Sequence, residues 1–358
     1  MTRAKLVPRV VWGKVVPWTV AVLVPVLVAG WIWWRESDTG ARWRFEDAMD
    51  SFCGGLLAHR EGPLFEGLPV GTMLENERRL RQDAWACGLQ SPSLQVVVAR
   101  LREGEKERVA RVVPEFRGER SPAPVGGGRQ GSSDGHLTVI VVGCRNSADR
   151  IAVSVNSYRS REEKDEHRVG GWVDSDLFRA RFATATAVEA AGRWNCEPRA
   201  GEALTALPPV LAAEPVGQAN GACAGLPFAR DRRLDTVHET PPGRGGLVEK
   251  CTVESADFDG AYVFRARFGL AAAQRSGGES TGHSGDAGAD GSWLWGSARC
   301  PGDAARSPFT GYLPPEARTA PDGRATGDRF GLPAFRAFAE RAAARHGCTD
   351  LKLPPAVR

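Results

Sequence analysis

Eight cysteines are the residues of this chain whose type and spacing most directly indicate chemistry. They are Cys53, Cys87, Cys144, Cys196, Cys223, Cys251, Cys300 and Cys348. An even number of cysteines in an exported chain predicts disulfide bonds. No CxxC pair occurs, which argues against a zinc ribbon and against a thioredoxin-like redox motif. We therefore predict that all eight cysteines are structural.

The cysteine spacing repeats along the chain. The gaps are 34, 57 and 52 residues in the first set of four and 28, 49 and 48 in the second. The first cysteine of each set opens a similar phrase, CGGLLA at 53–58 and CAGLPFA at 223–229. A Gly/Ser-rich stretch precedes the third cysteine in both sets, and a helical pattern precedes the fourth. These features, recurring in one order, predict an internal duplication.

A duplication restricts the disulfide pairing, because two self-contained copies are expected to bond within themselves and in the same way. Three patterns per copy remain, and sequence alone does not select one. We favour first with second and third with fourth, since each bond would then fix a terminal helix to the sheet that it covers. The favoured pairs are Cys53–Cys87, Cys144–Cys196, Cys223–Cys251 and Cys300–Cys348.

Other residue types with catalytic or ligand chemistry lack the spacing that such chemistry needs. The histidines are His59, His136, His167, His238, His283 and His346. His136 and His283 do not occupy equivalent positions in the two copies, and none of the six has the spacing of metal ligands, so we interpret each as a chance surface residue. The run REEKDEH at 161–167 is acidic enough to suggest a cation site, but Arg161 and Lys164 interrupt it, which favours a solvated loop.

Three tryptophans, Trp194, Trp293 and Trp295, are candidates for a ligand groove. Their place on a closing helix and beside a cysteine favours core packing instead. No HExxH, GxSxG, Walker A or GxGxxG motif occurs. The sequence thus predicts no catalytic residue, no cofactor and no metal.

The apolar run VVPWTVAVLVPVLVAGWIWW at 15–34 carries no charge over 20 residues. That length predicts a transmembrane anchor, with tryptophans at its outer end and the basic tail 1–14 in the cytoplasm. A signal peptide cleaved near Val28-Ala29-Gly30 is the alternative. In either case residues 35–358 are expected outside the cytoplasm, with the lipid bilayer as partner of residues 15–34.

The positions of the repeats define the expected domains. A juxtamembrane linker covers 35–43, module 1 covers 44–197, a Pro/Ala-rich linker covers 198–219 and module 2 covers 220–358. Strands are expected at 94–102, 108–116, 137–143 and 151–155, and helices before Cys53 and before each fourth cysteine. The predicted fold class is α+β: a transmembrane helix followed by two homologous modules, each a small antiparallel sheet with helices on one face.

The closing helices are predicted from their apolar stripes. In module 1 the stripe holds Phe178, Phe182, Ala185 and Val188. In module 2 Pro333 lies in the first turn, and the stripe holds Phe335, Phe338, Ala339 and Ala342.

A helical C-x-x-L-L phrase followed by a cysteine at the start of a strand resembles the small exported DUF3558-like proteins of actinobacteria. The resemblance covers about the first 50 residues of each module and implies an exported protein without an established catalytic site.

The charge balance bears on function. The net charge is +4, and Arg3, Lys5, Arg9 and Lys14 account for all of it, so the remainder gives no electrostatic case for nucleic acid. The sequence favours a membrane-anchored, non-enzymatic protein that binds or supports an envelope component or another exported protein. An exported hydrolase or transferase with an unrecognised site is the alternative.

Overall fold

A computed structural model gives the fold of the chain. The residues that it describes are 15–59, 74–89, 94–102, 113–116, 120–157, 176–209, 212–227, 234–254, 260–274, 285–303, 305–315 and 330–355. The acidic run at 161–167, His167, His283, the basic tail 1–14 and most of the expected strand 108–116 lie outside these ranges.

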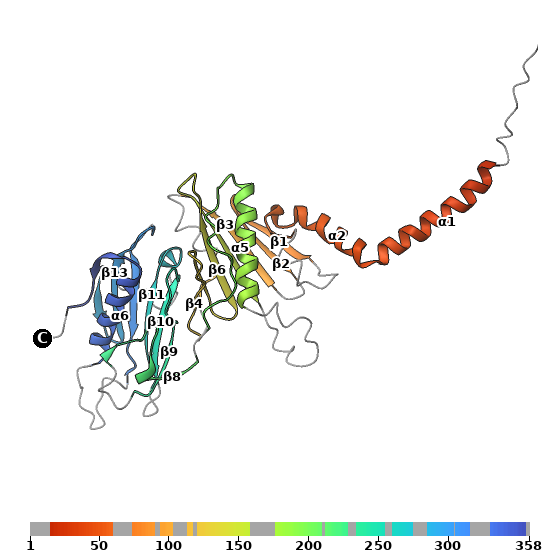
Figure 1. Cartoon of the computed structure of the whole chain (residues 1–358). Coiled ribbons are helices and arrows are strands. Elements are labelled where there is room, and N and C mark those ends of the chain that lie inside the picture. Colours follow the sequence, from red (N-terminus) through yellow and green to blue (C-terminus); the bar gives the residue numbers. More distant parts are fainter. Residues whose placement is uncertain are drawn as a thin grey trace, which may run out of the picture.

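The described chain begins with two consecutive helices and a short turn of 3-10 helix. These are α1 (Val15–Glu36), α2 (Asp38–Ser51) and η1 (Phe52–Gly55). Ser37 separates the helices, and its side-chain oxygen accepts a hydrogen bond from the Gly40 N–H at 3.1 Å, which caps α2. Figure 1 shows α1 and α2 extending away from the body of the molecule.

Module 1 contains a seven-stranded antiparallel sheet and the helix α5 (Asp176–Arg193). Its strands are β1 (Leu74–Arg81), β2 (Ala84–Leu89), β3 (Leu94–Leu101), β4 (Ala123–Pro124), β5 (Gln130–Ser133), β6 (Leu137–Gly143) and β7 (Arg150–Ser157). They lie in the order β1-β2-β3-β7-β6-β5-β4.

The second sheet has eight strands and is accompanied by the helix α6 (Gly331–Arg345). Its strands are β8 (Glu214–Pro215), β9 (Thr236–Glu239), β10 (Val248–Glu254), β11 (Ala261–Arg267), β12 (Gly288–Asp290), β13 (Trp293–Arg299), β14 (Ser307–Tyr312) and β15 (Thr349–Lys352). They lie in the order β12-β13-β14-β11-β10-β9-β8, and β15 pairs with β13. Two further 3-10 turns are η2 (Val216–Gln218) and η4 (Ala271–Ala273).

The two sheets follow the same path through the chain. The order β1-β2-β3-β7-β6-β5 in module 1 corresponds, strand by strand, to β9-β10-β11-β14-β13-β12 in module 2. The short strands β4, β8 and β15 are additions at the edges. Along the chain, α5 follows β7 and α6 follows β14, which are equivalent strands. The common order therefore accords with the predicted duplication.

Four disulfides join the pairs that the sequence favoured. They are Cys53–Cys87, Cys144–Cys196, Cys223–Cys251 and Cys300–Cys348. In each module the first bond links the opening turn to a central strand, and the second links the end of the closing helix to a neighbouring strand end. The pairing prediction is confirmed, and bonds that close loops of this size stabilise a fold by about 3–4 kcal/mol each in the chain-entropy model.

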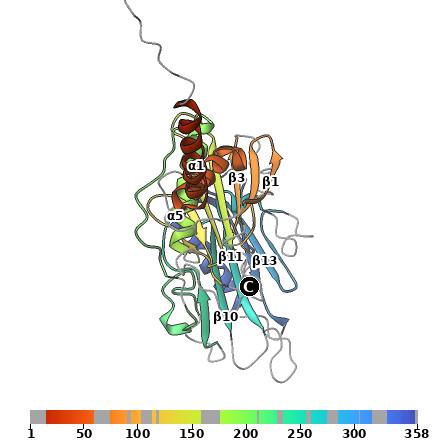
Figure 2. The same ribbon diagram turned by 90° about the vertical axis from the view of Figure 1, so that its right-hand side faces the viewer.

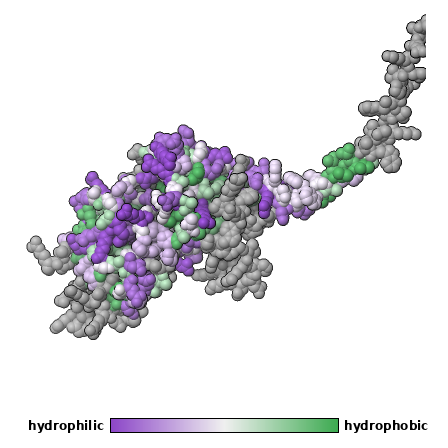
Figure 3. All heavy atoms as spheres, in the orientation of Figure 1, coloured by the Kyte–Doolittle hydropathy of each residue, from purple (hydrophilic) through white to green (hydrophobic). Residues whose placement is uncertain are grey.

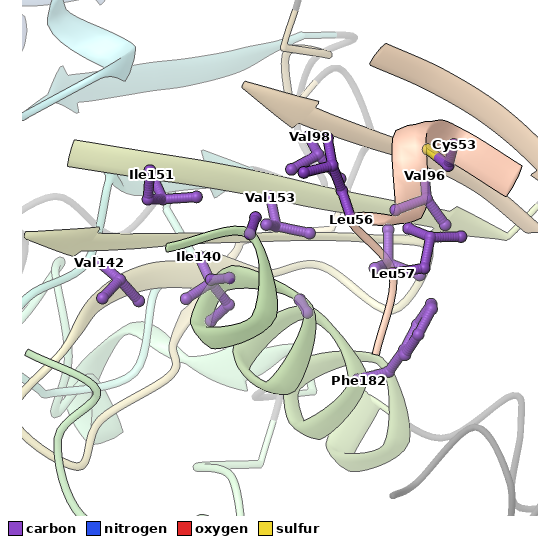
Figure 4. Close-up of a cluster of buried hydrophobic side chains, with 14 of the residues drawn as sticks. Cys53, Leu56, Leu57, Val96, Val98, Ile140, Val142, Ile151, Val153 and Phe182 are labelled. Carbon is purple, nitrogen blue, oxygen red and sulfur yellow. The ribbon is translucent and has the colours of Figure 1, made fainter. Parts of the chain in front are cut away.

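Each module has a hydrophobic core between its sheet and its closing helix. In module 1 the strand residues Val96, Val98, Ile140 and Val153 face Phe182 of α5, and all five are buried. Figure 4 shows these side chains pointing into the space between sheet and helix, beside the Cys53 turn. The core of module 2 is richer in aromatic residues and contains Tyr262, Phe264, Phe268, Phe309, Phe335 and Phe338.

A third hydrophobic cluster lies between the two sheets. Leu101, Val139 and Val141 of module 1 pack there with Leu247 and Leu270 of module 2. The opposite faces of the sheets are covered by α5 and α6, so the body is a four-layer arrangement of helix, sheet, sheet and helix (Figures 1 and 2). Burial on both faces explains the continuous apolar composition of strands such as LTVIVVG.

Hydrogen bonds also cross between the modules. Gly131 N–H donates to Gly245 O at 2.9 Å, and Leu247 N–H donates to Ser132 Oγ at 2.8 Å. Arg150 Nη2 donates to Gly302 O at 2.6 Å. These hydrogen bonds and the shared apolar cluster hold the two sheets against each other.

The predicted fold class is wrong. The described chain consists mostly of two large antiparallel sheets with few helices, not of small sheets carrying several helices. The strands that sequence reasoning missed have weak signals: β1 reads LENERRLR, and β5 reads QGSS within the Gly/Ser-rich stretch. Tertiary pairing imposes strand structure on both segments, because each completes a sheet whose neighbouring strands are strongly apolar.

The expected transmembrane helix is not found either. Among the residues that the structure describes, no helix is long and apolar enough to cross a membrane.

The apolar stripe predicted for α5 needs a smaller correction. Phe178 and Phe182 are buried as expected, but Val188 is exposed and Ala185 is half-buried. The buried face rotates toward Ala183 and Ala187 because small residues allow the helix to approach the sheet closely. For α6, Phe335, Phe338, Ala339 and Ala342 are all buried, as predicted.

Candidate functional site

The ends of α5 and α6 have the same backbone geometry, which identifies equivalent positions in the two modules. Cys196 N–H donates to Ala191 O at 2.9 Å, and Cys348 N–H donates to Ala343 O at 2.8 Å. The preceding residues, Asn195 and Gly347, both have positive φ values of 52° and 65°. One position earlier in each module, Trp194 is therefore equivalent to His346.

A second pair of equivalent positions lies on the central strands. Cys87 of β2 and Cys251 of β10 are matched by their disulfides and by their place in the strand order. Two residues before them stand Trp85 and Glu249. Module 1 thus carries two partly buried tryptophans that pack on its core, where module 2 carries a carboxylate and an imidazole.

Glu249 is the centre of this charged site. Its side chain is only 5% exposed, and it accepts hydrogen bonds from His346 Nε2 at 2.9 Å and from Arg345 Nε at 3.1 Å and Nη2. Burial by itself raises the pKa of the Glu249 carboxyl group. The hydrogen bonds from His346 and Arg345 and the positive charge of Arg345 outweigh burial and hold the pKa below its ordinary value, so Glu249 is ionised at neutral pH.

The imidazole of His346 is fixed on its other sides. It stacks on the Phe268 ring with a centroid distance of 3.5 Å and an interplanar angle of 7°. Nearby, Asp303 accepts hydrogen bonds from Gly269 N–H at 2.7 Å and from Ser307 Oγ. Burial raises the pKa of Asp303, and these hydrogen bonds offset part of the increase.

A pocket of about 340 Å³ opens beside Glu249. Arg341 and Arg345 of α6 line one side of it, and the segments 220–225 and 240–243 line the other. Arg341 donates to the carbonyl oxygens of Ala224 and Gly225, so α6 is tied to the turn that begins at Cys223. The pocket therefore combines one buried carboxylate with two guanidinium groups.

The comparison between modules indicates that the charged groups are not required by the fold. A buried ion pair is often no more stabilising than well-packed apolar residues of similar volume. Module 1 builds the same strand order and the same helix end with Trp85 and Trp194. This makes the pocket beside Glu249 the candidate functional site, and its charges are suited to recognising a charged ligand.

The arrangement does not assemble a nucleophile for catalysis. Ser307 is fully buried and its hydroxyl group is bound to Asp303 rather than to His346. Within the described ranges, no group of three or more His, Cys, Asp or Glu side chains could hold a metal ion.

Two of the six histidines lie in places that the sequence did not predict. His59 is 3% exposed, with Nδ1 at 2.8 Å from Leu57 O and Nε2 at 2.9 Å from Asp50 Oδ1. His346 belongs to the charged site. The prediction of chance surface residues is wrong for both, whereas His136 is exposed. The tryptophans Trp194, Trp293 and Trp295 are half-buried, and Trp194 packs on the core of module 1.

A repeated glutamate was also missed. Glu239 of β9 lies opposite Cys251 in the strand register, and its carboxylate accepts hydrogen bonds from the N–H groups of Asn220, Gly221 and Cys223 at 2.7, 2.8 and 2.5 Å. In module 1, Glu77 lies opposite Cys87 and accepts from Cys53 N–H. A glutamate ten to twelve residues before the second cysteine of each set was the available sequence signal.

No family model, no curated protein and no solved structure matches the chain. The resemblance to DUF3558-like proteins therefore stays a prediction. The fold and the disulfides themselves define a disulfide-bonded protein of two antiparallel sheets packed face to face.

Proposed function

We propose that this chain is an extracytoplasmic protein that binds or supports an envelope component or another exported protein, without catalysing a reaction. The observation that carries the proposal is the set of four disulfides, which engages every cysteine of the chain. Such bonds form and persist in oxidising compartments, and they are consistent with an extracytoplasmic protein.

The state of the polar groups supports binding over catalysis. Glu249, Arg345 and His346 bond to one another, and Arg341 bonds to backbone carbonyls. Groups held in this way present fixed charge to a ligand. The pocket volume of about 340 Å³ lies near the lower end of the range of about 300–1,000 Å³ for small-molecule sites.

We also propose that residues 15–34 associate with a lipid bilayer. In α1 the consecutive side chains of Val22, Leu23 and Val24 are 61%, 55% and 51% exposed, so apolar groups point outward on every side of the helix. Figure 3 shows this apolar surface on α1, set apart from the mostly polar body. A helix that is apolar all round is stable where a nonaqueous environment surrounds it.

The location is tested by fusing alkaline phosphatase, which folds only where its own disulfides form, to the C-terminus. We expect an active enzyme from the full chain and an inactive one when residues 1–34 are deleted. Membrane fractionation should find the full chain in the pellet and the chain without residues 1–34 outside it. Equal phosphatase activity of the two fusions, or free cysteines detected by alkylation in intact cells, would refute the proposed location.

A further inference from the structure

We propose that the pocket beside Glu249 binds a small ligand that carries a single carboxylate group, held by Arg341 and Arg345. This inference rests on the proposed binding function and deepens it by naming the class of ligand. Its supports are the charge of the pocket, the donors of its arginines, its size and the contrast with module 1.

The charges that line the pocket favour a monoanion. Arg341 and Arg345 contribute two positive charges, and the ionised Glu249 contributes one negative charge. The formal sum is +1, which a carboxylate neutralises. A dianion such as phosphate would bring a second negative charge close to the buried Glu249, and like charges at short range repel strongly where water is scarce.

The two guanidinium groups retain hydrogen-bonding capacity. Within the described part of the chain, Arg345 uses Nε and Nη2 to hold Glu249, and Arg341 uses Nη1 and Nη2 to hold the carbonyls of Ala224 and Gly225. Each guanidinium has five N–H groups, so these contacts leave donors on both. Arginine donors match the two oxygens of a carboxylate in geometry as well as in charge.

The remaining walls leave room for a ligand with a small apolar part. They come mostly from the Gly221-Ala222 and Ala224-Gly225 turns and from Pro241-Pro242, with Asn220 and Thr240 as their polar members. With a volume of about 340 Å³, the pocket admits a molecule the size of an acylated amino acid.

Module 1 shows how the same place is closed by aromatic packing. A methyl group added at Gly54 would lie 3.0 Å from the indole of Trp85, so this ring fills the space against the opening turn. The equivalent turn residue in module 2 is Ala224, which lines the pocket opposite Arg341. Replacing the ring by Glu249 leaves an open and charged site in module 2.

The test uses the full oxidised chain in detergent, titrated by calorimetry with N-acetylalanine. The neutral isostere N-acetylalaninamide and inorganic phosphate are the comparison ligands. We expect the acid to bind, the amide to bind at least tenfold more weakly, because it forms no charge-assisted bond, and phosphate to bind more weakly than the acid. Binding of the amide as tight as that of the acid, tighter binding of phosphate, or no binding of the acid would overturn the inference.

Variants locate the binding. Arg341→Gln keeps an N–H donor for a backbone carbonyl but removes the charge, and we expect it to weaken binding of the acid about tenfold. The double variant Glu249→Trp/His346→Trp reproduces the aromatic pair of module 1 and should abolish binding. The matched control is Arg193→Gln, at the module-1 position equivalent to Arg345, which should leave affinity unchanged.

Folding of the variants is checked by the four intact disulfides and by thermal melting. If the double tryptophan variant does not fold, Arg341→Gln against Arg193→Gln decides the matter alone. Equal affinity of these two variants, or binding that survives in a folded double variant, would place the ligand elsewhere. A negative result here leaves the extracytoplasmic location untouched, since the phosphatase fusion tests that separately.

Discussion

Replacing Glu239 by glutamine should destabilise module 2 strongly while keeping the shape of the side chain. Glu239 is 1% exposed, and its two carboxylate oxygens accept three backbone N–H groups of the segment 220–223. The amide of glutamine retains one oxygen, which continues to serve Asn220 and Gly221. Its NH₂ group then faces the Cys223 N–H, so two donors meet and one buried N–H loses its acceptor.

The expected loss follows from these contacts. A buried donor without a partner costs about 1–3 kcal/mol, and the remaining bonds lose their charge assistance. We therefore expect Glu239→Gln to lower the free energy of unfolding by about 2–4 kcal/mol. Glu77→Gln is the matched control in module 1, because Glu77 is exposed and bonds to Cys53 N–H. Its expected cost is about 1 kcal/mol.

Urea denaturation of the oxidised protein at neutral pH measures both variants. The slope of free energy against urea should stay the same, which shows that the difference lies in stability and not in the extent of unfolding. A cost of Glu239→Gln no larger than that of Glu77→Gln would refute this expectation, since the buried three-donor arrangement would then contribute nothing beyond an exposed single bond.

Two other variants test the inter-sheet packing and the charged site. Leu247→Ala removes a side chain that is 1% exposed between the sheets, so we expect a loss of about 2–5 kcal/mol in urea denaturation and a single cooperative transition for both modules; separate transitions would contradict a shared core. Glu249→Gln should lower the free energy of unfolding most at neutral pH. Because the pKa of Glu249 is lower in the folded state than its ordinary value of 4.5, the ionised carboxylate stabilises the fold above pH 4.5, and this stabilisation is lost as the pH falls through the folded-state pKa. Thermal melting of wild type and variant from pH 7 to pH 3 should show their difference shrinking on the acid side, and a constant difference would exclude ionised Glu249 as its source.

The disulfide pairs were predictable because they depend on chain order. Matched spacing in the two halves reduced the choices to three per module, and the link between each helix and its sheet selected one. Strongly apolar strands were predictable for a related reason. The segment 137–143 forms β6 with the expected bounds, and 94–101 forms β3, since a run of β-branched residues favours a strand in almost any context.

The weaker strands and the layer order were decided only by the tertiary structure. The charged sequence of β1 becomes a strand because β2 offers it a free edge, and the alternation of its side chains is then fixed by pairing. The packing of the two sheets against each other depends on which face of its sheet each module leaves uncovered by its closing helix. One helix covers one face of each sheet, and the other apolar faces are buried together.

The candidate site, too, was predictable from the sequence only in part. The sequence by itself determined that eight cysteines form four bonds and that the chain repeats one plan. It did not bring Glu249 to His346, which stand 97 positions apart and meet only because β10 and the end of α6 lie side by side. The sequence also did not show that Glu249 and His346 stand where module 1 has Trp85 and Trp194. The hydrogen bonds at the helix ends and the strand order were needed to identify these positions as equivalent. Contacts of this kind depend on where each side chain points after the sheets have formed, and that direction is set by long-range pairing rather than by local sequence.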